Sequence, residues 1–181
     1  MENYRVSQWT FDTSAGAEIG LGALLLSGGL ISLKDPHNNA HHFHYGGFGV
    51  GFSRGFELTR IQIPETITKN YVQSGNGSIT NFPGTGVVFM TKAFSGKELT
   101  KGDICGLAAY VEFGAGLVAG YGATLMFLGI NQMLALAGVP APQLHLLEIA
   151  IAQAPAILFM RGSNMGPQAS WALNGMLGML T

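Results

Sequence analysis

Four of the five histidines lie close together, and this cluster is the clearest candidate for chemistry in the chain. His37, His41, His42 and His44 lie within a short segment, and Asp35 is the nearest carboxylate. On a strand, His42 and His44 point to the same side, and together with His37 they would offer imidazole ligands to a transition metal. Because no cysteine lies nearby, we favour a solvated polar turn and predict no metal site. Protonation between about pH 5 and 7 would make His42 and His44 pH-sensing groups.

Two carboxylates are a second candidate for chemistry in the chain. Glu18 and Glu112 are the carboxylates inside the glycine-rich runs, and a pocket that gathered them with the histidines would allow acid–base catalysis. A charge on an exposed strand face or edge is the simpler interpretation. The chain contains no nucleophile elbow, no phosphate-binding glycine loop with its lysine, and no H-E-x-x-H motif. We therefore predict a protein that is not an enzyme and that needs no cofactor.

The residues that recur at regular spacing are glycines, which number 27 of 181. The central example is Val111–Ile130, in which Gly116 and Gly120 have the spacing that lets two helices approach closely in a membrane. At strand spacing, the glycines of this stretch share one side of a pleated ribbon. We expect a strand or hairpin in the soluble form and a helical zipper only in an inserted state. The small-residue spacings are Gly16/Gly20, Gly47/Gly51/Gly55 and Gly116/Gly120.

The composition narrows the class of protein. Charged residues make up 10% of the chain, against about 25% in ordinary soluble domains, and the net charge is −1. This balance excludes nucleic acid as a partner, because phosphates call for clustered Lys and Arg. After Asp103 the charged residues are Glu112, Glu148 and Arg161, so the C-terminal part is nearly neutral. The N-terminus lacks a basic segment followed by an apolar core, so we expect no cleaved secretory signal.

The charge-free stretch from Phe113 to Val139 exceeds the about 20 apolar residues that a membrane span needs. The mean hydropathy of the chain is nevertheless only +0.30, and the glycine-rich segments lack basic flanks. A permanently integral protein would show a stronger pattern. The resting form is therefore expected to be a compact, β-rich domain.

The period-two alternation of small and large residues favours a mainly β fold with a C-terminal helical segment (α+β), built on a glycine-rich antiparallel sandwich or barrel-like sheet. We expect one domain, 1–181, in which 1–130 is the glycine-rich β region and 131–181 is apolar and partly helical. The expected strands or hairpins are Arg5–Asp12, Ala15–Leu33, Gly47–Phe56, Gly84–Phe94 and Val111–Ile130, and the expected helices are Asn131–Ala137 and Gln143–Ala154.

The zipper spacings, the small size, the near-neutral C-terminal half and the missing signal peptide resemble the small pore-forming antibacterial effectors of bacterial type VI secretion. The resemblance implies delivery by the secretion tube, through an Hcp-type ring or a spike component, and insertion into the inner membrane of a target bacterium. It also implies ion leakage, an immunity protein in the producer and a homo-oligomer. Such a protein is cytoplasmic before export and membrane-associated when active.

On this hypothesis the seven zipper glycines listed above insert into the membrane, and Glu18, Glu112, His42 and His44 sense charge or pH. The alternative hypothesis is a non-catalytic lipid-binding module or a structural, self-assembling β module, in which the glycines serve packing alone.

Overall fold

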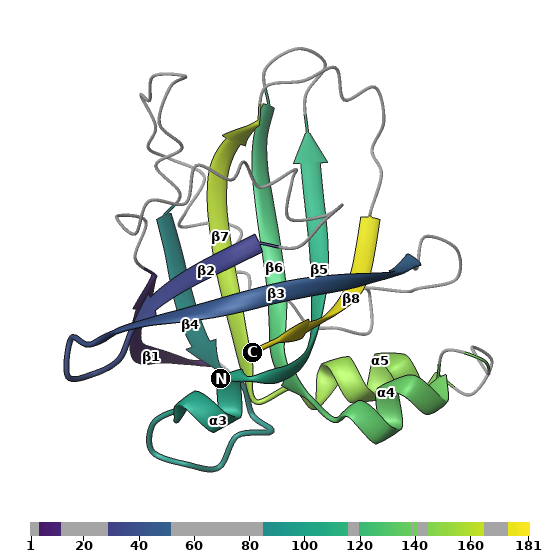
Figure 1. Cartoon of the computed structure of the whole chain (residues 1–181), viewed down its shortest axis with the longest axis horizontal. Helices are drawn as coiled ribbons and strands as arrows, with labels where there is room; N and C mark the ends of the chain where they lie inside the picture. The colour runs from purple at the N-terminus through teal and green to yellow at the C-terminus, as the bar shows by residue number, and fades with distance from the viewer. Residues whose placement is uncertain are drawn as a thin grey trace.

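The computed structural model of the 181-residue chain describes residues 4–11, 29–51, 85–115, 120–138, 140, 145–164 and 174–181. Within these residues eight strands form a closed barrel, in the order β1-β2-β3-β8-β5-β6-β7-β4 (Figure 1). Every neighbouring pair is antiparallel. The strands are β1 (Arg5–Phe11), β2 (Gly29–Lys34), β3 (Ala40–Gly51), β4 (Thr85–Met90), β5 (Gly106–Ala115), β6 (Gly120–Ile130), β7 (Ala156–Asn164) and β8 (Asn174–Leu180). The helices are α3 (Lys101–Ile104), α4 (Gln132–Gly138) and α5 (Leu146–Ala152). The predicted mainly β fold with some helix is confirmed.

The stretch Val111–Ile130 is a β-hairpin, as expected. Strands β5 and β6 pair from Leu107 with Ile130 to Ala115 with Tyr121, and residues 116–119 between them lie outside the described residues. A helix here would have carried several glycines, each costing about 1 kcal/mol relative to alanine. A strand tolerates them where neighbouring chains approach closely.

Two strands lie in the C-terminal region, where the sequence analysis assigned none. Strand β7 begins at Ala156, directly after Pro155, and β8 ends one residue before the C-terminal Thr181. The run from Ala156 to Met160 is apolar at every position because both faces of β7 are buried. Such a run has no period-two alternation and cannot be distinguished from a buried helix by periodicity.

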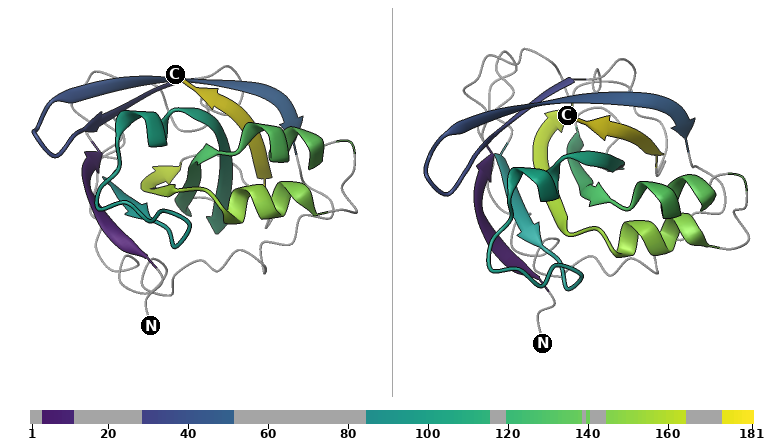
Figure 2. Two further views of the ribbon diagram at one scale, coloured as in Figure 1. Left: turned by 90° about the horizontal axis from the view of Figure 1, so that it is seen from below. Right: turned by 60° about the horizontal axis from the view of Figure 1, so that its bottom comes forward.

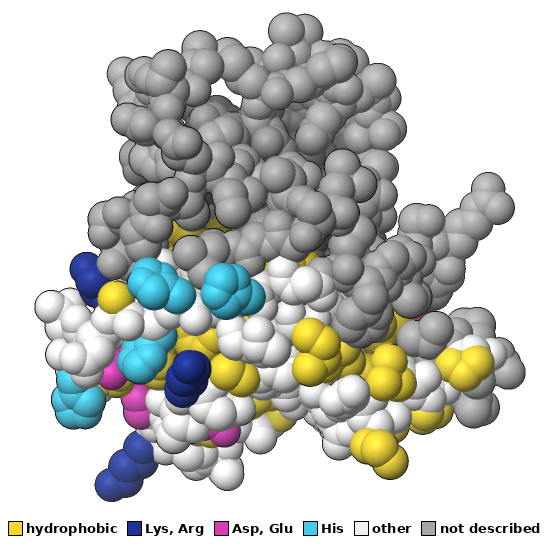
Figure 3. Space-filling model, viewed as in Figure 1, with side chains coloured by type: hydrophobic (Ala, Val, Ile, Leu, Met, Phe, Trp, Pro, Cys, Tyr) yellow, Lys and Arg dark blue, Asp and Glu magenta, His cyan; other side chains and the backbone are white. Residues whose placement is uncertain are grey.

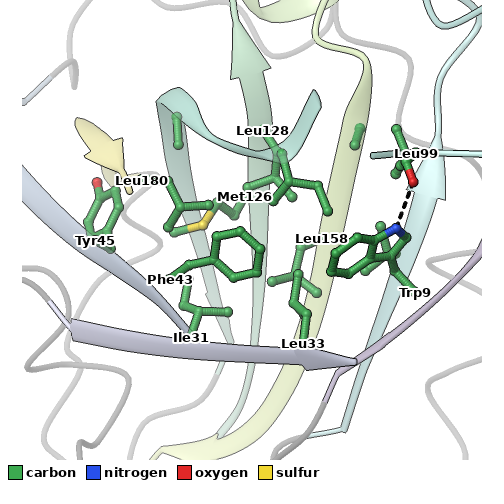
Figure 4. Close-up of a cluster of buried hydrophobic side chains, with 14 of the residues drawn as sticks. Trp9, Ile31, Leu33, Phe43, Tyr45, Leu99, Met126, Leu128, Leu158 and Leu180 are labelled. Carbon is green, nitrogen blue, oxygen red and sulfur yellow. Dashed lines mark hydrogen bonds between the residues drawn. The ribbon is translucent and has the colours of Figure 1, made fainter. Parts of the chain in front are cut away.

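The two buried faces belong to two separate cores. Side chains of β6 and β7 point into the barrel, where Met126, Leu128 and Leu158 pack against Phe43 and Trp9 (Figure 4). We call this set the barrel interior. Phe43, Leu128 and Leu158 are fully buried, and each apolar side chain of this size contributes about 1.5–3 kcal/mol by leaving water.

Other side chains of the same strands point outward, toward the helices. Leu125, Phe127, Ile157 and Phe159 pack with residues of α4 and α5 in a second cluster, the helix-facing core. The strands β4–β8 are thus the middle layer between β1–β3 and the helices. The two helices are held in place by an apolar sheet face.

The loop that precedes α3 is fixed to β1 by several hydrogen bonds, and the carboxylate of Glu98 accepts three of them. Glu98 accepts hydrogen bonds from Ser7 Oγ at 2.5 Å and from the backbone N–H groups of Gln8 and Leu99. Burial raises the pKa of Glu98, but these hydrogen bonds and the Arg5 charge outweigh it and lower the pKa overall. The indole N–H of Trp9 donates to the carbonyl of Leu99 at 2.8 Å, which closes this corner of the barrel interior.

One glycine of β8 allows β3 and β8 to come close. Gly178 pairs with Gly47, and a Cβ at Gly178 would meet the ring of Tyr45 and the carbonyl oxygen of Gly46, the latter at 2.7 Å. Tyr45 is buried, so its ring has little room to move. Gly46 is the matched contrast, because a Cβ there would meet nothing within 4 Å.

We therefore expect Gly178→Ala to lower the free energy of unfolding by about 1–3 kcal/mol, as overpacked sites do. Gly46→Ala should leave it unchanged or raise it slightly, because alanine restricts the unfolded chain. Urea unfolding followed by circular dichroism measures both. If both variants lost the same free energy of unfolding, the contact between Gly178 and Tyr45 would not control the pairing of β3 with β8.

Candidate functional site

Helices α4 and α5 form a hairpin that packs side by side at the lower end of the barrel in Figure 1, and both views in Figure 2 show the same arrangement. α4 begins after Asn131, whose side-chain oxygen accepts the backbone N–H of Leu134 at 3.1 Å, as an N-cap does. A Cβ on Gly138 would meet the backbone nitrogen of Leu147. The end of α4 therefore touches the start of α5, and glycine is required there.

The inner side of the hairpin combines small and large apolar residues. Ala135, Ala150 and Ala154, together with Ile151, are buried in the helix-facing core, and Leu134 and Leu147 pack against it. Both helices therefore present an apolar side to the sheet.

Three large apolar side chains of the hairpin face outward. Met133 is 85% exposed, and Leu136 and Ile149 are each 42% exposed. We call these three residues the hairpin surface; apolar side chains gather over this region at the lower right of Figure 3. The sequence from Asn131 to Met160 contains no Lys, Arg or Asp, and its one glutamate, Glu148, is buried. The outer side of the hairpin is therefore apolar and uncharged.

The buried Glu148 is held by a histidine at the start of α5. Its carboxylate lies 2.5 Å from Nδ1 of His145, which is half-exposed. His145 has a φ of +52°, a left-handed conformation that is uncommon for residues other than glycine but is enriched in Asn, Asp and His. The residue gives Glu148 a polar partner where α5 begins.

None of the helices in the described ranges has the length and apolar character needed to cross a bilayer.

The histidine cluster lies on the β2–β3 turn and on β3. His42 and His44 are exposed on the outer side of the barrel, as their strand spacing predicts, and the histidines are visible at the left of Figure 3. His41 instead lies beside Trp9, with ring centroids 5.2 Å apart, and its Nε2 is 3.1 Å from an oxygen of Asp35. Across the described ranges, no group of three or more His, Cys, Asp or Glu residues has the geometry to hold a metal ion.

Asp35 is the acceptor that shapes this turn. It accepts hydrogen bonds from the side chain and backbone of Asn39 and from the backbone N–H of His37, and it faces His41. The Asn39 side chain, followed by the Asn39 backbone, His41 and His37, holds the pKa of Asp35 well below its usual range, although burial opposes the shift. The predicted polar turn is thus organised by a carboxylate, with His41 as one of its partners.

The predicted glycines lie in strands wherever the structure describes them. Gly47 and Gly51 belong to β3, and Gly120 is the first residue of β6. Their role in membrane insertion stays a prediction. Gly16, Gly20, Gly55 and Gly116 lie outside the described residues, as does Glu18.

The structure does not bring the remaining candidates together. Glu112 of β5 pairs with Asn174, at the start of β8, whereas the backbone of His44 bonds to that of Thr181, beyond its end. Because a strand rises about 3.3 Å per residue, Asn174 and Thr181 lie about 20 Å apart along the direction of β8. Glu112 and the outward histidines therefore do not form one acid–base site.

The hairpin surface was not among the sequence candidates. The absence of charge from Asn131 to Met160 was visible in the sequence, but it does not show which side of each helix faces water. Both helices have large apolar residues on the buried side as well as on the exposed side, so the composition does not distinguish the two sides.

The fold and the site together define a small, closed antiparallel β-barrel that carries an uncharged, apolar helical hairpin at one end. The chain is 31% identical over 171 residues to the toxin protein Tse4 of Pseudomonas aeruginosa, an alignment that covers 94% of this chain and 82% of Tse4. The chain belongs to the Tse4 toxin family. No family model matches it, and no solved structure matches it. The predicted toxin character is confirmed; the route of delivery and pore formation stay predictions.

The Asp35 turn predicts a defined acid response. Because the pKa of Asp35 is lower in the folded than in the unfolded chain, its stabilising effect is present above the unfolded pKa of about 3.9 and is lost as the pH falls below it. The difference in melting temperature between the unaltered protein and Asp35→Asn should be constant between about pH 6 and 5 and shrink below about pH 4. Differential scanning calorimetry measures this difference. A gap that stays constant to the lowest pH would contradict the assignment.

The link between His145 and Glu148 predicts a second, independent effect. His145→Ala leaves the buried carboxylate without its hydrogen-bond donor and should cost about 1–3 kcal/mol at neutral pH. His145→Asn should cost less, because asparagine tolerates a positive φ and keeps an N–H donor. Urea unfolding measures both variants. If they lose equal stability, ring packing rather than the hydrogen bond fixes the start of α5.

Proposed function

We propose that the protein is an antibacterial toxin that inserts into the inner membrane of a target cell and forms ion-permeable pores. Membership of the Tse4 toxin family supports the toxin part of this proposal. The observation that carries the membrane part is the hairpin surface, where three large apolar side chains are exposed on helices without any exposed charge. Interfacial helices bury apolar side chains of this kind at the boundary between headgroups and acyl chains.

The described helices are too short to form the pore wall by themselves. α4 and α5 have 7 residues each and are about 10 Å long, against a hydrocarbon core of about 30 Å. The segment Val111–Ile130 would reach about 30 Å as a helix, and Gly116 and Gly120 would let copies approach closely. In this proposal β5 and β6 leave the barrel and refold in lipid, where backbone groups must be satisfied inside helices or closed barrels.

The remaining parts of the proposal follow the resemblance to type VI effectors. The protein is delivered by the secretion tube, on a spike component or inside an Hcp-type ring, and is neutralised in the producer by an immunity protein. It acts as a homo-oligomer without catalytic residues or cofactors. Gly16, Gly20, Gly47, Gly51 and Gly55 supply further small-residue contacts between segments.

The alternative is a non-catalytic, self-assembling β module. The close approach of β3 and β8 at Gly178 supports it, because there a glycine serves packing in the folded barrel. If the zipper glycines have this role as well, Gly116→Val and Gly120→Val abolish folding in solution.

Ion leakage from lipid vesicles tests the proposal. Purified protein should release potassium from vesicles, and the same protein directed to the periplasm should depolarise the inner membrane and stop growth. No leakage at any pH, together with no growth defect, would overturn it.

A matched set of valine variants tests the zipper. Gly120→Val should keep the strand fold, because Gly120 begins β6 and valine favours strands. Gly120→Val and Gly116→Val should each reduce leakage at least about tenfold by blocking close helix approach. Gly122→Val is the control, because Gly122 also lies in β6 but on the opposite side of a helix from Gly120. Equal leakage from the Gly120 and Gly122 variants, both folded by circular dichroism, would contradict the zipper.

A further inference from the structure

The hairpin surface is too small to be the core of a stable protein interface. Two helices of about 10 Å length, lying side by side about 10 Å apart, present an outer face of roughly 200 Å². A stable protein–protein interface buries about 800 Å² on each partner. A second copy of this chain or a protein partner would therefore need a larger apolar area than Met133, Leu136 and Ile149 provide. A bilayer has no such minimum, because each inserted side chain contributes separately.

The chemistry around the hairpin surface fits a membrane interface without fixed charge. Asn131, Gln132 and Gln153 are exposed at the ends of the two helices, and all three are polar and neutral. Amide side chains at this level form hydrogen bonds with lipid headgroups and the water between them. Interfacial helices that depend on anionic lipid carry Lys or Arg on the polar side, and the segment from Asn131 to Met160 carries neither.

The hairpin is also placed so that it can reach a flat surface. It lies at one end of the barrel, next to the outer face of the sheet and on the opposite side from β1 (Figure 2). Met133, the most exposed of the three side chains, is on the first turn of α4. The barrel can therefore stay folded while these side chains enter the interfacial layer.

We propose that the hairpin surface, Met133, Leu136 and Ile149, is where the folded protein first docks on a lipid bilayer, and that it binds by apolar insertion independent of headgroup charge. This inference rests on the proposed function and specifies its first step. Docking precedes the refolding of β5 and β6, so binding and leakage are separable.

The test is sedimentation of the full chain with vesicles of phosphatidylcholine alone and with vesicles that also contain phosphatidylglycerol, at low and high salt. The altered protein carries Met133→Gln, Leu136→Gln and Ile149→Gln, because glutamine keeps the helix propensity. The control is Val6→Thr, which removes an apolar side chain that is 64% exposed on β1, away from the hairpin. Circular dichroism confirms that both variants are folded.

The unaltered protein should bind equally to both vesicle types at both salt concentrations. The triple variant should bind at least about tenfold more weakly than the unaltered protein, and Val6→Thr should bind as the unaltered protein does. Undiminished binding of the folded triple variant would overturn the inference. Binding that requires phosphatidylglycerol, or that high salt abolishes, would also overturn it. So would a concentration-dependent dimer that the triple variant loses, since the surface would then bind a second copy.

A fluorescent label separates this inference from the proposed function. In a Cys105→Ser background, an environment-sensitive dye on Met133→Cys should shift its emission to shorter wavelength with neutral vesicles, and the same dye on Val6→Cys should not. Leakage without a shift at position 133 would contradict the docking surface and leave the proposed function intact. A shift without leakage would support the docking surface and contradict pore formation.

Discussion

The burial of both faces of the strands β4–β8 is the constraint on which the structure depends. One face packs with Trp9 and Phe43 in the barrel interior, and the other packs with the helix-facing core. The outer face would expose Phe127 and Phe159 to water if the hairpin of α4 and α5 did not cover it. The hairpin is therefore a part of the fold, although its own outer side is apolar.

The proposed membrane role would require this arrangement to change. The helices contribute Ala135 and Ala150 to the core beside the sheet and keep Met133 and Ile149 outside. A hairpin that moved into lipid would keep its own side chains in an apolar environment, but it would expose the sheet to water unless the sheet also entered the lipid. The largest polar obstacle is Glu148, whose buried carboxylate is satisfied by His145. The pair ties the start of α5 to the folded form.

Much of the fold could be predicted because its strands alternate. Arg5–Phe11 buries Ser7 and Trp9 and exposes the residues between them, and Val111–Ile130 places its glycines at even spacing. Strand β7 could not be predicted in this way, because burial on both faces removes the alternation from Ala156 to Met160. For the same reason the sequence favoured a helical C-terminal region over the strands found there.

The candidate site was harder to predict than the fold. The histidines were conspicuous in the sequence, yet His41 serves the Asp35 turn and His42 and His44 project from the barrel without a third ligand among the described residues. The hairpin surface depends on which side of α4 and α5 faces the sheet, and a helix that is apolar all round does not encode that choice in its periodicity. Packing against the outer face of the sheet, which appears only in three dimensions, decides it.

We propose that the folded toxin becomes an ion-conducting assembly in a bilayer. The most direct measurement is the conductance of a planar bilayer of neutral lipid after addition of the purified protein. Discrete current steps should appear with the unaltered chain and become rare with the Met133, Leu136 and Ile149 triple variant. A bilayer that stays electrically silent while the folded protein binds to it would contradict this proposal.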